Sequence, residues 1–184
     1  MNGPKRIGRL AKLIFLVLYG TLMFALKFAM MNFPNIEPVT PMIICLTSVF
    51  GAWAFVSVYV YVGLELYIFG LGIWNVMYLY VWALLTLLIW ALRHPVNFLD
   101  GFMKNKGIFM SGCYSIVAGV FGVLFGMLCC IPYIFAFGIE YAVAWVVTGF
   151  PFDITHCVGN IVMTAILFYP LFKVMNFAKR KFLV

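Results

Sequence analysis

The sequence has few charged residues. Only 9% of its 184 residues are Asp, Glu, Lys or Arg, whereas 66% are hydrophobic. A typical soluble domain carries about 25% charged residues. The 12 Lys and Arg and 5 Asp and Glu are too few to cover the surface of a globule in water. This deficit excludes a water-soluble protein and indicates an all-α integral membrane protein, with residues 1–184 forming a single transmembrane domain.

Several catalytic and binding motifs are also missing. The chain has 2 histidines and no HExxH, GxSxG or repeated acidic motif, which argues against an enzyme. It has no GxxxxGKS or GxxxxGKT phosphate loop, so active transport would take its energy from another subunit or an ion gradient. The 5 cysteines lack CxxC spacing, so neither a disulfide framework nor a metal site is predicted.

The net charge of +7 does not indicate nucleic-acid binding. The basic residues form short clusters beside apolar runs, as the enrichment of Lys and Arg in cytoplasmic loops explains. Clusters before the first run, after the fourth run (Arg93, Lys104 and Lys106) and at the C-terminal end place both termini in the cytoplasm. This parity predicts six transmembrane helices, at about 10–31, 39–51, 53–70, 74–92, 108–130 and 155–174.

An apolar stretch at residues 132–151 remains between the fifth and sixth predicted spans. The basic clusters before and after this region are both expected in the cytoplasm, so the number of crossings between them must be even. A further complete crossing would make it odd, and we therefore expect an outer cap or a re-entrant segment. Irregular backbone at membrane depth is tolerated where it lines a cavity, and the stretch therefore points to a ligand pocket. The outer face is expected to carry four acids, namely Glu37, Glu65, Glu140 and Asp153.

Polar and aromatic side chains gather at the predicted outer ends of three segments. Polar groups are costly in a bilayer, so these positions mark a candidate site. An alternative for Asp153 is a helix N-cap. The tryptophans and Tyr78 could instead form an interfacial aromatic belt. The candidate substrate-binding residues are Asn35, Glu37, Trp74, Asn75, Tyr78, Trp82, Asp153, His156 and Asn160.

The first predicted helix carries a stripe of small side chains. Thr21, Ala25 and Ala29 are four residues apart, which places them on one face and permits close approach of another helix. Packing within the bundle and docking to a partner are both open. Lys27 is expected to extend to the outer headgroups, or alternatively to pair with Glu37 or a ligand.

Three segments resemble the substrate-binding S-components of energy-coupling factor (ECF) vitamin transporters. They are PNIEPVT at 34–40, WNVMYLYVW at 74–82 and GFPFDITHCVGN at 149–160, and they are similar to the branch proposed to take up cobalamin. The resemblance implies a multi-pass subunit of the prokaryotic cytoplasmic membrane. Such a subunit would capture a vitamin, favoured to be cobalamin or a related corrinoid, from outside, with no permanently bound cofactor.

The resemblance also implies partners. These are an EcfT-type transmembrane coupling protein and two ABC ATPases, besides membrane lipid. In the family an Ala-x-x-x-Ala pattern on the first helix contacts the coupling protein. The matching residues here are Ala25 and Ala29, with Thr21 one step earlier.

Two other hypotheses stay open. The chain could be an S-component for a different vitamin such as thiamine or queuosine. It could instead be a structural or regulatory membrane protein that binds lipid or a partner helix and transports nothing. In that case the outer cluster would be only an interfacial belt, and substituting His156 or Asn160 would leave no ligand phenotype.

Overall fold

The computed structural model describes residues 3–33, 35–103 and 107–182, and these contain helices and connecting loops but no strand. The predicted all-α class is confirmed. Pro34, Lys104 and Lys106, which entered the predicted outer motif and a cytoplasmic cluster, lie outside the described residues. The elements are α1 (Gly3–Ala29), α2 (Val39–Phe50), the 3-10 helix η1 (Gly51–Trp53), α3 (Ala54–Phe69), α4 (Ile73–Val76), α5 (Tyr78–Asp100), α6 (Ile108–Cys129), α7 (Ile131–Phe137) and α8 (Ile139–Phe182).

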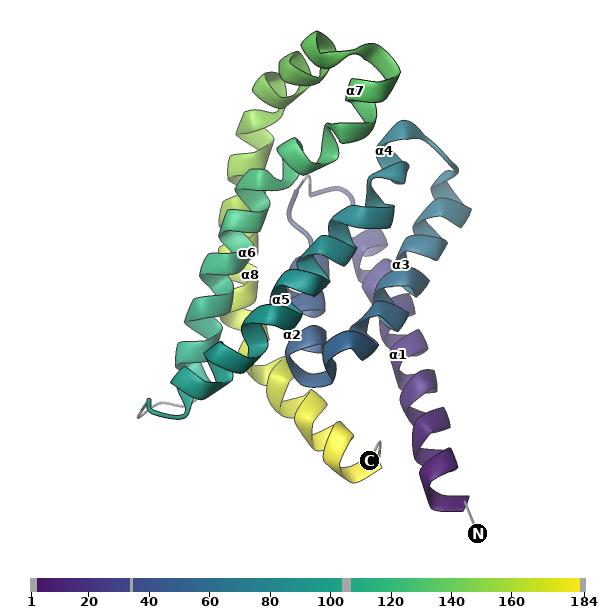
Figure 1. Cartoon of the computed structure of the whole chain (residues 1–184), viewed down its shortest axis with the longest axis vertical. Coiled ribbons are helices and arrows are strands. Elements are labelled where there is room, and N and C mark those ends of the chain that lie inside the picture. The colour runs from purple at the N-terminus through teal and green to yellow at the C-terminus, as the bar shows by residue number, and fades with distance from the viewer. Residues whose placement is uncertain (1–2, 34, 104–106, 183–184) are drawn as a thin grey trace.

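Both termini lie at the same end of the elongated helix bundle (Figure 1). That end also holds η1 and the connection between α5 and α6, and it is termed the basic end because α8 finishes there with Lys179, Arg180 and Lys181. The opposite end holds the loop between α1 and α2, helix α4, and a hairpin formed by α7 and the first turns of α8. It is termed the hairpin end.

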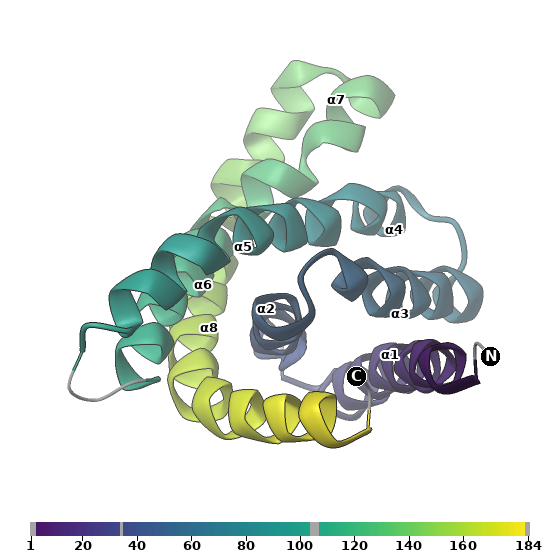
Figure 2. The same cartoon turned by 60° about the horizontal axis from the view of Figure 1, so that its bottom comes forward.

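Among the described residues, five helical segments are long and apolar enough to cross a bilayer: Gly8–Ala29, Val39–Phe69, Ile73–Asp100, Ile108–Phe137 and Ile139–Lys181. The second of them is not one straight helix. At η1 the chain turns sharply, because Gly51 adopts a φ of 60° that side chains rarely allow. Helix α3 then returns toward the hairpin end (Figures 1 and 2). The predicted break near Gly51 is confirmed.

Helix α2 lies in the centre of the bundle (Figure 2). All 12 of its residues are buried, so an apolar sequence on every face is what its position requires. Two cations lie at its C-terminal end. Lys179 Nζ donates to the Val49 carbonyl at 2.7 Å, and the Arg93 guanidinium packs against Gly51. Positive charge at this point complements the helix dipole.

The last helix of the structure begins earlier than the sixth predicted span, 155–174. Helix α8 is continuous over 44 residues and includes both Pro151 and Pro170, so the sixth predicted span, 155–174, covers only part of it. Proline removes one helical hydrogen bond, but helices in membrane proteins tolerate this loss. The segment 132–151, predicted to be an outer cap or a re-entrant segment, is helical. It forms a helical hairpin closed at Gly138 (φ 88°) that projects from the bundle (Figure 1).

A glycine stripe joins α6 closely to α8. A Cβ atom on Gly122 would lie 2.8 Å from the Cα of Cys157, and one on Gly119 would lie 2.6 Å from the Ile161 side chain. Gly126 continues the stripe one turn later. Small residues at such spacing let helix backbones approach within van der Waals contact. The stripe therefore fixes α8 against α6 below the hairpin.

Candidate ligand-binding site

A cavity of about 180 Å³ lies at the hairpin end, between the α1–α2 loop and helices α5, α6 and α8. It is lined by four of the predicted substrate-binding residues, Asn35, Glu37, Tyr78 and His156. The rest of its lining comes from the end of α1, the following loop and α6, and consists of Lys27, Met30, Met31, Phe33, Ile36 and Phe125.

The four predicted residues reach the cavity from three distant parts of the chain. Asn35 and Glu37 stand in the α1–α2 loop, Tyr78 opens α5, and His156 lies within α8. Asn35 has a φ of 57°, a left-handed conformation that asparagine adopts more readily than most residues. The loop therefore turns at Asn35 and directs the chain across the mouth of the cavity.

Lys27 points into the protein and forms an ion pair with Glu65 of α3. The Nζ and Oε2 atoms are 2.6 Å apart, and the Glu65 side chain is fully buried while that of Lys27 is 16% exposed. The ammonium group also lies 5.1 Å from the ring centroid of Tyr78. The expectation that Lys27 extends to the headgroups is wrong, and its partner is not Glu37. An acid inside an apolar span requires such a partner, which is the signal that could have identified Glu65.

Glu37 provides a second carboxyl group, in the connection before α2. Burial raises the pKa of Glu37 to about 7, with a smaller opposing effect from the charge of Lys27 and a raising effect from Glu65. Near neutral pH both protonation states of Glu37 are therefore populated. In its protonated form it can donate a hydrogen bond to a ligand, and in its ionised form it can pair with a cation.

Several buried polar atoms beside the cavity have no hydrogen-bond partner among the described residues. They are both ring nitrogens of His156, the Tyr61 hydroxyl, Trp82 Nε1 and Glu65 Oε1. Burying such a group without a partner costs about 1–3 kcal/mol. Only His156 among them lines the cavity, while Tyr61 and Trp82 pack behind Tyr78. The two ring nitrogens of His156 are therefore the groups to which a polar guest in the cavity could supply the missing hydrogen bonds.

Aromatic rings form the wall between the cavity and the core. The rings of Phe125 and His156 meet edge to face, with centroids 4.6 Å apart. Trp82 is fully buried and lies behind the lining, 5.7 Å from both Tyr78 and Phe125. Trp74 packs edge-on against Tyr78 at 6.3 Å and is 42% exposed. The rings that line the cavity are those of Phe33, Tyr78, Phe125 and His156, and the two predicted tryptophans pack against Tyr78 from outside the lining.

Three predicted site residues lie elsewhere and bind backbone groups. Asn75 is buried in α4, and its amide donates to the Gly70 carbonyl at 2.7 Å. Asp153 accepts a 3.0 Å hydrogen bond from the Gly126 N–H of α6, and it is not an N-cap because α8 begins well before it. Asn160 donates to a carbonyl of α6 at 3.3 Å. Residues 132–151 do not contribute to the lining either.

The small-residue stripe on α1 faces away from the bundle. Thr21, Ala25 and Ala29 are all exposed, so packing within the bundle is excluded for this stripe. Helix α1 instead meets α3 at Gly20, where a Cβ atom would collide with the Ser57 carbonyl. The stripe leaves a smooth outer surface on α1 that lipid or another helix can contact.

No protein-family model, curated protein or solved structure matches this chain. The fold and the cavity are consistent with a class rather than a named family. The class is a multi-pass helical membrane protein with a small polar cavity, walled by aromatic rings, near one end of the bundle.

Proposed function

We propose that the protein is the substrate-binding subunit of a membrane importer, of the kind represented by the S-components of ECF vitamin transporters. The observation that carries this proposal is the convergence of Asn35, Glu37, Tyr78 and His156 on one cavity. These residues come from the three segments that resemble the family. The unpartnered ring nitrogens of His156, which lines the cavity, support the same conclusion, since a bound ligand could satisfy them.

The proposed topology has six passages and both termini in the cytoplasm. The position of both termini at the basic end favours an even number of passages (Figure 1). Helix α2 would count as one passage although its 12 residues span only about 18 Å, because protein rather than lipid surrounds it. Basic residues favour the cytoplasmic side, so the cavity would open to the outside of a prokaryotic cell.

The proposed ligand is a small heterocyclic vitamin. A cavity of about 180 Å³ lies below the usual range of about 300–1,000 Å³ for drug-sized ligands, so a modest opening of the α1–α2 loop would admit a molecule of the size of thiamine. Cobalamin or another corrinoid would require the cavity to widen several-fold. Aromatic rings on one side and carboxyl, ammonium and imidazole groups on the other suit a flat ligand with polar edges.

Energy would come from other subunits. The sequence contains no phosphate-binding loop, so ATP hydrolysis would be performed by two ABC ATPases joined through an EcfT-type coupling protein. The exposed surface at Thr21, Ala25 and Ala29 is the proposed place where that coupling protein docks. Small side chains there would allow a partner helix to approach closely.

Thermal stabilisation of the purified protein against a vitamin panel tests this proposal. A ligand present at 100 times its dissociation constant adds about 2.7 kcal/mol to the free energy of unfolding, which is a readily measured shift. Thiamine or a molecule of similar size should give the largest shift. A shift with cobalamin alone would support the importer but contradict the proposed size of the ligand. No shift across the panel, for a folded preparation, would contradict the importer and favour the non-transporting alternative.

A further inference from the structure

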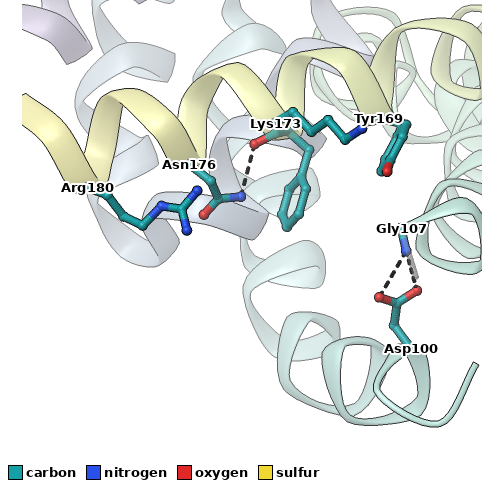
Figure 3. Close-up of a pocket in the computed structure, with 7 residues that line it drawn as sticks. Asp100, Gly107, Tyr169, Lys173, Asn176 and Arg180 are labelled. Carbon is teal, nitrogen blue, oxygen red and sulfur yellow. Dashed lines mark hydrogen bonds between the residues drawn. The ribbon is translucent and has the colours of Figure 1, made fainter. Parts of the chain in front are cut away.

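A second, larger cavity lies at the basic end of the molecule (Figure 3). It is an open groove of about 640 Å³ between the C-terminal part of α8 and the connection from α5 to α6. Its lining includes two cations and several polar groups, namely Asp100, Gly107, Tyr169, Lys173, Asn176 and Arg180. It is remote from the vitamin cavity, and none of the proposed vitamin-binding residues lines it.

The groove-facing side of α8 has a regular pattern. Tyr169, Lys173, Asn176 and Arg180 are spaced by four, three and four residues, which places them along one helix face. The Lys173 ammonium lies 4.2 Å from the centroid of the Tyr169 ring, and the Asn176 amide donates to the Phe172 carbonyl at 2.9 Å. Two positive charges therefore stand about two turns apart on one wall of the groove (Figure 3).

The acid in the groove does not neutralise these cations. Both carboxylate oxygens of Asp100 accept hydrogen bonds from the Gly107 N–H, at 2.8 and 3.0 Å, and one also accepts from the Met110 N–H at 3.3 Å. Asp100 thus caps the start of α6 from a buried position. Within the described part of the chain, Lys173 and Arg180 have no carboxylate within ion-pair distance.

Apolar surface continues along α8 beside the groove. Ile166, one turn before Tyr169, is 64% exposed, and the groove wall itself contains Phe172. A ligand that fits these features has an anionic head for the two cations and hydrocarbon chains for the neighbouring helix surface. Basic pockets between helices at a membrane surface bind lipid headgroups through the same combination.

We propose that this groove binds the phosphate headgroup of an anionic phospholipid. Lys173 and Arg180 hold the phosphate oxygens through charge-assisted hydrogen bonds, and Tyr169 forms one side of the groove. The acyl chains lie along the exposed apolar surface of α8. A lipid held there connects the end of α8 to the α5–α6 connection and stabilises the basic end of the bundle.

The test compares the thermal stability of the protein in lipid nanodiscs of phosphatidylcholine with and without phosphatidylglycerol. Phosphatidylglycerol should raise the melting temperature of the wild-type protein. The fraction of phosphatidylglycerol in the nanodisc is then varied. In a Lys173→Gln/Arg180→Gln variant the fraction that gives half of the wild-type shift should rise by about tenfold or more, because two charged hydrogen-bond donors are lost. The melting temperature of this variant in phosphatidylcholine alone, close to that of the wild type, would show that it folds.

The matched control removes the same charge from another part of the basic end. Arg9→Gln/Lys12→Gln alters two cations of α1 that do not line the groove, and it should keep the full phosphatidylglycerol response. Equal losses in the two variants would reduce the effect to general charge attraction and overturn the proposal. A wild-type shift of the same size with soluble glycerol phosphate would also overturn it, since a free anion would then be sufficient.

Discussion

Lys27 of α1 and Glu65 of α3 form a buried ion pair, with 2.6 Å between Nζ and Oε2. The pair joins two helices through residues that are 38 positions apart in the chain. Lys27 also lines the candidate vitamin cavity, and Glu65 has a second oxygen without a hydrogen-bond partner among the described residues. The pair is thus both an interhelical link and a charged edge of the site.

Breaking this pair from one side should be more harmful than removing it. Lys27→Met leaves Glu65 buried without its partner, and we expect a loss of about 3–5 kcal/mol in the free energy of unfolding. The double variant Lys27→Met/Glu65→Leu removes both charges and should be more stable than Lys27→Met alone. Thermal unfolding in one detergent measures all three proteins. Additive losses in the double variant would contradict the buried pair.

The contact between α6 and α8 gives a second prediction. A methyl group at Gly122 would meet the backbone of Cys157 at 2.8 Å, so Gly122→Ala should cost about 1–3 kcal/mol by separating the helices. The control is Gly112→Ala on the same helix, where a Cβ atom meets nothing within 4 Å. That change should leave stability equal or up to about 1 kcal/mol higher, because alanine favours the helix. Similar melting temperatures for the two variants would contradict the packing described.

The raised pKa of Glu37 predicts how the stability of the protein changes with pH. This pKa is about 7 in the folded protein, against 4.5 for the exposed group, so the folded state binds the proton more tightly. The resulting stabilisation is complete below pH 4.5, the pKa of the exposed group, and it is lost as the pH rises through the folded-state pKa of about 7. The melting temperature of the wild type should therefore fall more between about pH 5 and about pH 8 than that of Glu37→Gln. Glu140→Gln, at an exposed position on α8, is the control and should behave like the wild type.

Much of the fold follows from the sequence. Low charge and long apolar runs predicted a helical membrane protein, and the turn at Gly51 was visible as a glycine within an apolar run. The start of the last helix was not predicted, because α8 continues through Pro151 and Pro170. The glycines at 119, 122 and 126 were visible as a spacing, but only the structure shows that they face α8.

The candidate site was predicted in part. Position near predicted helix ends was enough to identify Asn35, Glu37, Tyr78 and His156, because polar groups are rare in membrane segments. The same criterion also selected Asp153, whose carboxylate instead binds the Gly126 N–H. The sequence does not distinguish a polar side chain that lines a cavity from one that binds a backbone group, because both arrangements keep the polar group away from lipid. Phe125 carries no local signal either, since it is one of 20 phenylalanines.

The most direct test of the ligand-binding claim uses the unpartnered polar atoms. His156 lines the cavity, and the Tyr61 ring lies directly behind the lining residue Tyr78, with 6.4 Å between the ring centroids. Tyr61→Phe and His156→Phe each remove buried groups without hydrogen-bond partners in the described residues. If a ligand normally supplies those partners, each variant without ligand should be as stable as the wild type or up to about 1–3 kcal/mol more stable. With the ligand identified from the panel, each should bind about tenfold or more weakly.

Tyr114→Phe is the matched control for this measurement. Its hydroxyl is also buried without a partner among the described residues, but Tyr114 packs against Phe168 and does not line the candidate cavity. The affinity for the ligand should be measured for all four proteins by isothermal titration. The predicted result is weaker binding for Tyr61→Phe and His156→Phe, with wild-type affinity for Tyr114→Phe. Wild-type affinity in all three variants, or destabilisation of the ligand-free His156→Phe protein, would contradict the assignment of this cavity as the binding site.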